Sequence, residues 1–169
     1  MDMNTILKSV LSSDAIGQVG KLAGIDEKDA ANALTEIIPF LMKGAQGQSK
    51  ATGNGFLEAL LEHGEKDSSD MAKFVKNIDV EDGAKIVKHL LGGEQTAAAK
   101  KAAEKSGIDA KTIAKIMAIA APIIMNQLGK SAKKSSKKAD KSDLGDVVTG
   151  LMDGVDAGDV LNIAKMFLK

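Results

Sequence analysis

The fold is decided by residues 107–128, which read GIDAKTIAKIMAIAAPIIMNQL. Apolar side chains recur there every three or four residues, which is the spacing of one face of an α-helix. The members of this stripe are Ile113, Ile116, Met117, Ala120, Ile123, Ile124 and Leu128. Gly107 can end a preceding helix in the left-handed conformation, and Asp109 can cap the next helix, as Asp26 and Asp79 can at two other helix starts. We therefore expect a short helix, a tight turn and a long apolar helix.

Helical spacing also holds along most of the remaining chain. Further stripes are Met3/Ile6/Leu7/Val10/Leu11, Ala30/Ala33/Leu34/Ile37/Ile38/Leu41, Phe56/Leu57/Leu60/Leu61, Val80/Ala84/Val87/Leu90/Leu91 and Val160/Leu161/Ala164/Phe167/Leu168. No segment shows the alternation of apolar and polar residues that marks a half-buried strand. The sequence therefore predicts an all-α protein folded as a multi-helix bundle.

The chain carries an internal similarity. A shift of 83 positions, from Gly24 to Gly107, places one Gly-Ile-Asp on the other and Pro39 on Pro122. Proline inside a helix removes a backbone hydrogen bond and kinks the helix. We expect a duplicated helix-turn-helix unit, or kinked hairpin, over about residues 3–50 and 84–128, with intervening helices over 54–83. The turn, cap and kink positions would be Gly24, Asp26, Pro39, Gly107, Asp109 and Pro122.

The predicted core, residues 1–128, is followed by two segments of opposite charge. Residues 129–142 hold six lysines and one aspartate, and we expect them to form a lysine-rich linker that is either mobile or a frayed helix. Residues 143–169 hold five aspartates and two lysines, and we expect an acidic helical tail that folds back as a pair of helices. Inside the core, residues 44–55 (GAQGQSKATGNG) are predicted to be a glycine-rich loop.

Composition excludes several kinds of site. The 169 residues include no Cys, Trp, Tyr or Arg, so all 23 cations of the Lys+Arg count are lysines, balanced by 23 acids. Without Cys there is no disulfide, thiolate nucleophile or cysteine zinc site. Without Arg there is no bidentate fork for phosphate or carboxylate. The hydrophobic fraction of 44% nevertheless supplies a sizeable core.

We expect a soluble, cytoplasmic protein. The N-terminus, MDMNTILKSVLSS, lacks the basic and apolar regions of a signal peptide. The longest apolar run, residues 116–125, is about half of the ~20 residues that a transmembrane helix needs. The sequence therefore predicts no transmembrane segment.

Four short segments resemble a known bacterial family. They are DGAKIVKHLLGG (residues 82–93), SGID (106–109), APIIM (121–125) and LGK (128–130). They are similar to the family catalogued as domain of unknown function 937, over about residues 3–130. The resemblance implies a bacterial, all-helical protein of a family with no established activity, and it supplies no catalytic residues.

Catalytic, cofactor and metal residues are not predicted. His63 with Glu62 and Glu65 could suggest a metal site, but a surface or helix-end histidine is the favoured interpretation because metal sites usually recruit three or more ligands. His89 precedes a predicted helix end, where a cation suits the helix dipole. Asp153, Asp156 and Asp159 lack the spacing of a calcium loop.

Two features leave nucleic-acid binding open. Residues 102–116 resemble the helix-turn-helix of transcriptional repressors, in which Lys111, Thr112 and Lys115 would face the major groove. The candidate anion contacts in the linker are Lys130, Lys133, Lys134, Lys137, Lys138 and Lys141. They would bind nucleic acid or an anionic surface weakly and without sequence preference.

Our leading hypothesis is a non-enzymatic protein-interaction or scaffold module that needs no cofactor and binds an unknown protein partner or itself. Its eight methionines could adapt to a partner surface. The alternative is a nucleic-acid-associated protein that uses the helix-turn-helix-like motif and the lysine-rich linker.

Overall fold

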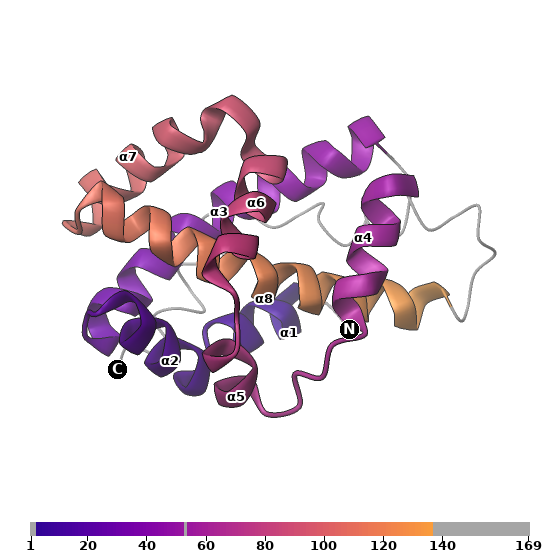
Figure 1. Ribbon diagram of the computed structural model, residues 1–169, viewed down its shortest axis with the longest axis horizontal. Coiled ribbons are helices and arrows are strands. Elements are labelled where there is room, and N and C mark those ends of the chain that lie inside the picture. The colour runs from indigo at the N-terminus through magenta and orange to yellow at the C-terminus, as the bar shows by residue number, and fades with distance from the viewer. Residues whose placement is uncertain (1–2, 53, 137–169) are drawn as a thin grey trace.

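The computed structural model describes residues 3–52 and 54–136, and every regular element in those ranges is a helix (Figure 1). The α-helices are α1 (Met3–Val10), α2 (Ser13–Ala23), α3 (Glu27–Thr52), α4 (Asn54–Gly64), α5 (Met71–Lys76), α6 (Val80–Leu91), α7 (Gln95–Ser106) and α8 (Ala110–Ser136), with the 3-10 turn η1 (Gly92–Glu94) before α7. The predicted all-α class is therefore confirmed. The predicted tail over residues 143–169 and the linker residues 137–142 lie outside the described ranges.

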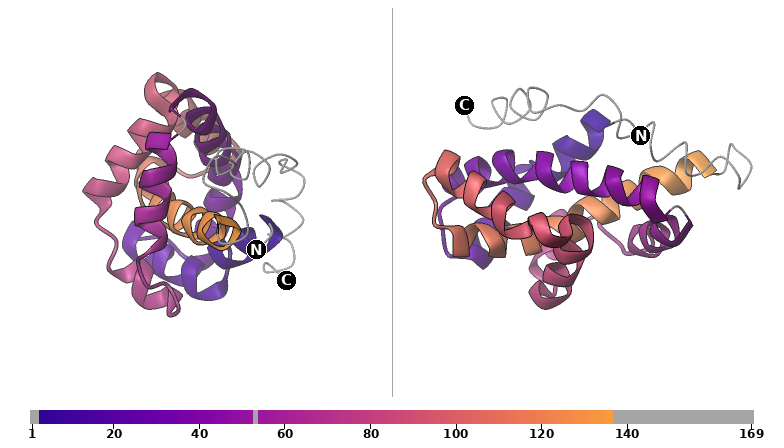
Figure 2. Two further views of the ribbon diagram at one scale, coloured as in Figure 1. Left: turned by 90° about the vertical axis from the view of Figure 1, so that its right-hand side faces the viewer. Right: turned by 90° about the horizontal axis from the view of Figure 1, so that it is seen from above.

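Helix α8 forms the centre of the molecule, with the other long helices packed around it (Figures 1 and 2). The predicted stripe from Ile113 to Leu128 is buried. Burying each large apolar side chain contributes about 1.5–3 kcal/mol relative to leaving it exposed. The segment Ala110–Lys133 is long and apolar enough to cross a membrane, and 83% of its most apolar window is buried inside the protein. A core helix passes the same test, so this segment is weak evidence for a span.

The two longest helices begin with the same kind of turn. Gly24 (φ 76°) and Gly107 (φ 74°) adopt the left-handed conformation after α2 and α7. Asp26 Oδ1 accepts a hydrogen bond from the backbone N–H of Asp29 at 2.7 Å. Asp109 accepts from the N–H and the hydroxyl of Thr112, at 3.0 and 2.6 Å, and these bonds lower the pKa of its carboxyl.

Proline lies inside both long helices, with Pro39 in α3 and Pro122 in α8. Helix starts are also capped at Ser12, Asp70 and Asp79, whose side chains accept from the first turns of α2, α5 and α6. Of these three caps, only Asp79 was predicted from the sequence.

The predicted loop over residues 44–55 is wrong, because α3 continues to Thr52. Gly44 and Gly47 lie within this helix, and Gly44 serves packing. A Cβ at Gly44 would lie 2.8 Å from the carbonyl oxygen of Leu90, so glycine lets α3 approach the end of α6. Ala45 is fully buried next to it. Packing of this face therefore outweighs the low helix propensity of glycine.

The first part of the predicted linker is helical, because residues 129–136 belong to α8. Gly129, Ser131 and Ala132 are buried, whereas Lys133 is exposed. The small residues fit against the protein while the lysine side chain remains at the surface. Because small residues form the buried face of this segment and lysine lies on its exposed face, the segment is helical despite its low-complexity composition.

Two glycines set how closely the neighbours of α8 approach it. A Cβ at Gly83 of α6 would overlap the carbonyl oxygen of Ala118. A Cβ at Gly129 of α8 would overlap the carbonyl oxygen of Leu60 of α4. Both overlaps are with backbone, which cannot rotate away. The crossings of α6 and α4 over α8 therefore require glycine.

We predict that Gly83→Ala lowers the free energy of unfolding by about 1–3 kcal/mol, because overpacking forces α6 away from α8. Gly47→Ala is the matched control, since a Cβ there meets nothing within 4 Å. The control should raise stability by about 0.5–1 kcal/mol through helix propensity. Urea unfolding followed by circular dichroism measures both values, and equal effects of the two substitutions would contradict the proposed crossing.

Candidate functional site: a groove between α4, α5 and α6

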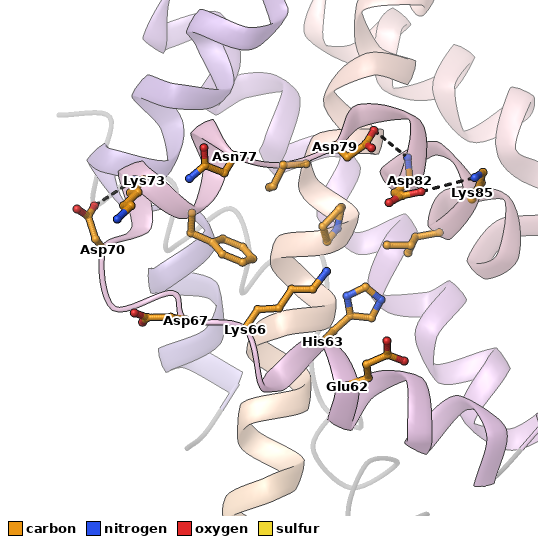
Figure 3. A pocket seen from close by; sticks show the side chains of 14 residues that line it. Glu62, His63, Lys66, Asp67, Asp70, Lys73, Asn77, Asp79, Asp82 and Lys85 are labelled. Carbon is orange, nitrogen blue, oxygen red and sulfur yellow. Dashed lines mark hydrogen bonds and ion pairs between the residues drawn. The ribbon is translucent and has the colours of Figure 1, made fainter.

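A groove of about 670 Å³ opens between the end of α4, helix α5, the start of α6 and Pro122 of α8. We call it the α4–α6 groove. Its volume lies within the range of about 300–1,000 Å³ that is usual for binding pockets. Figure 3 shows His63 and Lys66 on one side, and Asp79 and Asp82 on the other.

The floor of the groove is apolar. Phe74 and Ile78 come from α5 and the segment after it, Ile86 from α6 and Pro122 from the middle of α8. All four side chains are half-buried, and the first three pack against the main core. Each element turns its fully buried residues, such as Val75 and Val87, toward the core. The groove is therefore floored by the outer edge of the apolar stripes.

The rim of the groove is charged and its balance is negative. The acids that line it are Glu62, Asp67, Asp70, Asp79 and Asp82, and the lysines are Lys66, Lys73 and Lys85. With His63 neutral, three lysines against five acids leave a formal charge of 3 − 5 = −2. A negative rim favours a partner that carries positive charge.

Most of the aspartates also shape the local backbone. Asp70 and Asp79 cap α5 and α6, and Asp67 accepts from the N–H of Ser69 at 2.9 Å. The hydrogen bonds from Ser69 lower the pKa of the Asp67 carboxyl. Asp82 Oδ1 lies 3.6 Å from Lys85 Nζ, and both side chains are exposed. Such exposed pairs contribute little to stability, about 0–1 kcal/mol.

Buried polar side chains of α8 hold the loop between α4 and α5. Asn126 Nδ2 donates to the carbonyl oxygens of His63 and Lys66, at 2.6 and 3.0 Å. Gln127 Nε2 donates to Ser68 Oγ at 3.2 Å. Asn126 is completely buried and Gln127 is 4% exposed, so water cannot replace these bonds. The position of the rim at His63 and Lys66 therefore depends on two polar residues of the core helix.

His63 lies half-buried in the last turn of α4. Burial lowers the pKa of its imidazole below the ordinary value of 6.5, and the charge of Lys66 lowers it further. Glu62 and Asp82 oppose this effect. The side chain is therefore predominantly neutral at pH 7 and adds no charge to the groove.

The described residues contain no group of three or more His, Cys, Asp or Glu side chains placed to hold a metal ion. Glu65, considered above as a metal ligand with Glu62 and His63, pairs instead with Lys133, with 3.7 Å between Glu65 Oε1 and Lys133 Nζ. His89 is exposed in the last turn of α6. Asp153, Asp156 and Asp159 lie outside the described ranges.

The candidate anion contacts are only partly described. Lys130 Nζ donates to Ser68 Oγ at 2.6 Å, and Lys133 pairs with Glu65. Lys134 belongs to α8. Lys137, Lys138 and Lys141 lie outside the described residues. The lysines of α8 at positions 130 and 133 are thus engaged within the protein.

The segment that resembles a helix-turn-helix forms the end of α7, the turn at Gly107 and the start of α8. Lys111 and Lys115 are exposed, and Thr112 is half-buried with its hydroxyl bonded to Asp109. Ile113 and Ile116, on the other face of the same turns, are fully buried. Only the outer face of this first part of α8 is accessible.

Most groove residues were not selected from the sequence, which pointed to Glu62, His63, Asp79 and Pro122 there and assigned them other roles. Lining residues come from segments up to 60 positions apart, from Glu62 to Pro122. One usable signal was the pair Asn126-Gln127, two amides inside an otherwise apolar helical stretch. Buried amides need partners, so they indicate a loop or helix end docked against that point.

Comparison with known proteins supports a single assignment. Residues 5–131 match the family described as "Bacterial protein of unknown function (DUF937)". No match was found among curated proteins or among solved structures. The matched range runs from within α1 through most of α8 and includes every residue of the α4–α6 groove.

We predict that Asn126→Ala lowers the free energy of unfolding by about 1–3 kcal/mol, because two carbonyl oxygens lose their donor. Asn32→Ala, a half-buried position of α3, is the control and should change stability by less than about 0.5 kcal/mol. Hydrogen exchange at residues 64–70 should accelerate in Asn126→Ala only. Unchanged exchange in this loop would contradict its proposed anchoring by α8.

The lowered pKa of His63 predicts a pH effect. The unfolded chain binds the proton more readily than the folded protein, so stability from this group is complete above pH 6.5 and is lost as pH falls toward the folded-state pKa. His63→Gln should therefore reduce the loss of stability between pH 6.5 and about pH 5, measured by urea unfolding. His89→Gln is the exposed control, and an equal reduction in both variants would refute the effect of burial at His63.

Proposed function

The chain belongs to this bacterial family of unknown function, and we propose that it is a non-enzymatic protein-interaction module whose binding surface is the α4–α6 groove. One observation carries the proposal: four apolar side chains, from α5, the segment after it, α6 and α8, form the floor of a groove with a charged rim. This combination is typical of surfaces that accept an apolar segment and orient it with polar contacts.

The charges of the rim indicate the chemistry of the partner. A segment with apolar side chains at helical spacing, flanked by Lys or Arg, would place its anchors on Phe74, Ile78 and Ile86 and its charges near the acids. Such recognition depends on a few well-buried anchors, while charge sets orientation and association rate. The partner is thus a basic amphipathic segment of another protein or of a second copy of this chain.

We assign no catalysis to the groove. His63 is the one imidazole that lines it, and the lining residues include no Ser, Thr, Cys or Tyr that an imidazole could activate. The floor consists of aliphatic, aromatic and proline side chains, which can bind an apolar segment but carry no reactive group. We also propose that this interaction module works in the cytoplasm.

We propose further that the scaffold consists of two copies of one unit, α2–α3 and α7–α8. The matching left-handed glycines, Gly24 and Gly107, support this proposal, as do the capping aspartates that follow each. The long helices have 26 and 27 residues, with a proline inside each. On this proposal, duplication produced the two helical hairpins α2–α3 and α7–α8. Helices α4–α6, which lie between them in the sequence, form most of the groove.

Nucleic-acid binding is the second candidate function. The observation in its favour is that Lys111 and Lys115 are exposed directly after the turn at Gly107. Phosphate contacts of this kind weaken steeply as salt rises. Fluorescence anisotropy with mixed duplex DNA would support this candidate if affinity falls with salt and with Lys111→Glu/Lys115→Glu, and would exclude it if neither changes binding.

Peptide selection with the full chain tests the groove directly. A random peptide library displayed on phage should yield binders with apolar anchors flanked by Lys or Arg. Glu62→Lys should weaken these binders roughly tenfold, because one rim attraction becomes a repulsion. Glu58→Lys is the matched control, since Glu58 is exposed one turn earlier on α4 and does not line the groove.

The proposal fails if the selected peptides bind wild type and Glu62→Lys equally, or if the selection enriches no binder above an unrelated helical protein. Light scattering of the purified chain over a range of concentrations identifies the second-copy case. A concentration-dependent oligomer that Glu62→Lys dissociates would show that the groove binds another copy.

A further inference from the structure

A second groove, of about 480 Å³, lies between α3, the end of α6 and α7, whereas the α4–α6 groove adjoins the first part of α6. We call it the α3–α7 groove. Phe40, Leu91 and Ala97 give it apolar walls, and Phe40 and Leu91 are half-buried members of the core periphery. The close approach of Gly44 to Leu90 forms its floor.

The charge of this second groove is opposite in sign to that of the first. Lys43 and Lys101 line it against Glu94, which leaves a formal charge of 2 − 1 = +1. The Lys105–Glu36 pair, 3.7 Å apart, joins α7 to α3 one turn beyond Lys101. An apolar segment with negative charge would therefore suit the α3–α7 groove and would be disfavoured in the α4–α6 groove.

This chain itself contains such a segment. Residues 143–169 hold five aspartates against two lysines, a formal charge of 2 − 5 = −3. Apolar residues at helical spacing close the segment, namely Val160, Leu161, Ala164, Phe167 and Leu168. The segment thus combines the apolar spacing and the charge sign that the α3–α7 groove requires.

The segment is also within reach. The C-terminal ends of α3 and α8 lie at the same end of the molecule (Figures 1 and 2). The groove includes Gly44, Gly47 and Gln48, which lie within the last turns of α3. The six residues 137–142 can span up to roughly 20 Å when extended, and the first part of 143–169 adds to this reach.

We propose that residues 143–169 dock into the α3–α7 groove of the same chain, with the apolar stripe 160–168 on Phe40 and Leu91 and the aspartates near Lys43 and Lys101. This inference concerns a different surface from the proposed function and does not depend on it. Docking of the tail would leave the α4–α6 groove open to its partner.

The absence of cysteine makes the full chain suitable for site-specific spin labels. One label is placed in the tail, at Asn162→Cys, and the other beside the α3–α7 groove, at Lys100→Cys. Lys100 is exposed and does not line the groove, so its label leaves the surface free. A second pair, Asn162→Cys with Glu81→Cys, reports on the neighbourhood of the α4–α6 groove. Pulsed electron paramagnetic resonance then measures the distribution of distances within each pair.

We expect one narrow, short distance for the pair at 162 and 100. Lys43→Glu with Lys101→Glu should lower the ratio of docked to undocked tail roughly tenfold, because two attractions become repulsions. Lys73→Glu with Lys85→Glu, in the other groove, is the charge-matched control and should leave the distance narrow.

Three results would overturn the proposal. The first is a broad distribution for 162–100 in the unmodified background. The second is a short distance for 162–81 instead, which would place the tail at the α4–α6 groove. The third is a short 162–100 distance that disappears on dilution with unlabelled chain, which would assign the tail to a second copy.

Discussion

The structure depends on the burial of one helix. Helix α8 carries the longest apolar run of the sequence, residues 116–125, and it is stable in water only because the neighbouring helices cover it. Glycine at positions 83 and 129 lets α6 and α4 approach its backbone closely. These two crossings lie on either side of Pro122, where the floor of the α4–α6 groove reaches α8. The groove is thus a consequence of where α4 and α6 are held on α8.

The polar exceptions in α8 are as important as its apolar stripe. Burying an amide without a partner costs about 1–3 kcal/mol, yet Asn126 and Gln127 are almost completely buried. They are tolerated because they hydrogen-bond the end of α4 and the loop that follows. The described residues contain no buried side-chain polar atom without a partner. One helix therefore supplies Pro122 to the apolar floor and the two polar anchors of the rim.

The elements that depend on local sequence could be predicted. The stripe from Ile113 to Leu128 and the capping aspartate at 79 depend on spacing and on neighbours within one helical turn, and the all-helical class follows from such patterns. The continuation of α3 through Gly44 and Gly47 could not be predicted in this way. Glycine is usually a helix breaker, and its use here depends on contact with Leu90, a residue far away in the sequence.

The candidate site was harder to predict for the same reason. Its floor combines α5, α6 and Pro122, and its charge follows from side chains that only the tertiary structure brings together. The sequence separates its charges by segment, with a lysine-rich stretch over 129–142 and an acidic stretch over 143–169. The structure brings some of these charges together in two grooves of opposite sign, −2 and +1, one at the first part of α6 and one at its end. This separation gives one chain two surfaces with different preferences.

The central claim, that α8 organises the molecule and holds the groove walls, is tested most directly by native-state hydrogen exchange of the full chain. Amides of residues 113–129 should exchange only through global unfolding, because this part of α8 is covered on most sides. Amides of α5 and of the loop before it should exchange through smaller openings that leave α8 protected. Exchange of α8 as fast as that of α5 would show that the groove walls do not depend on α8, and would contradict the account.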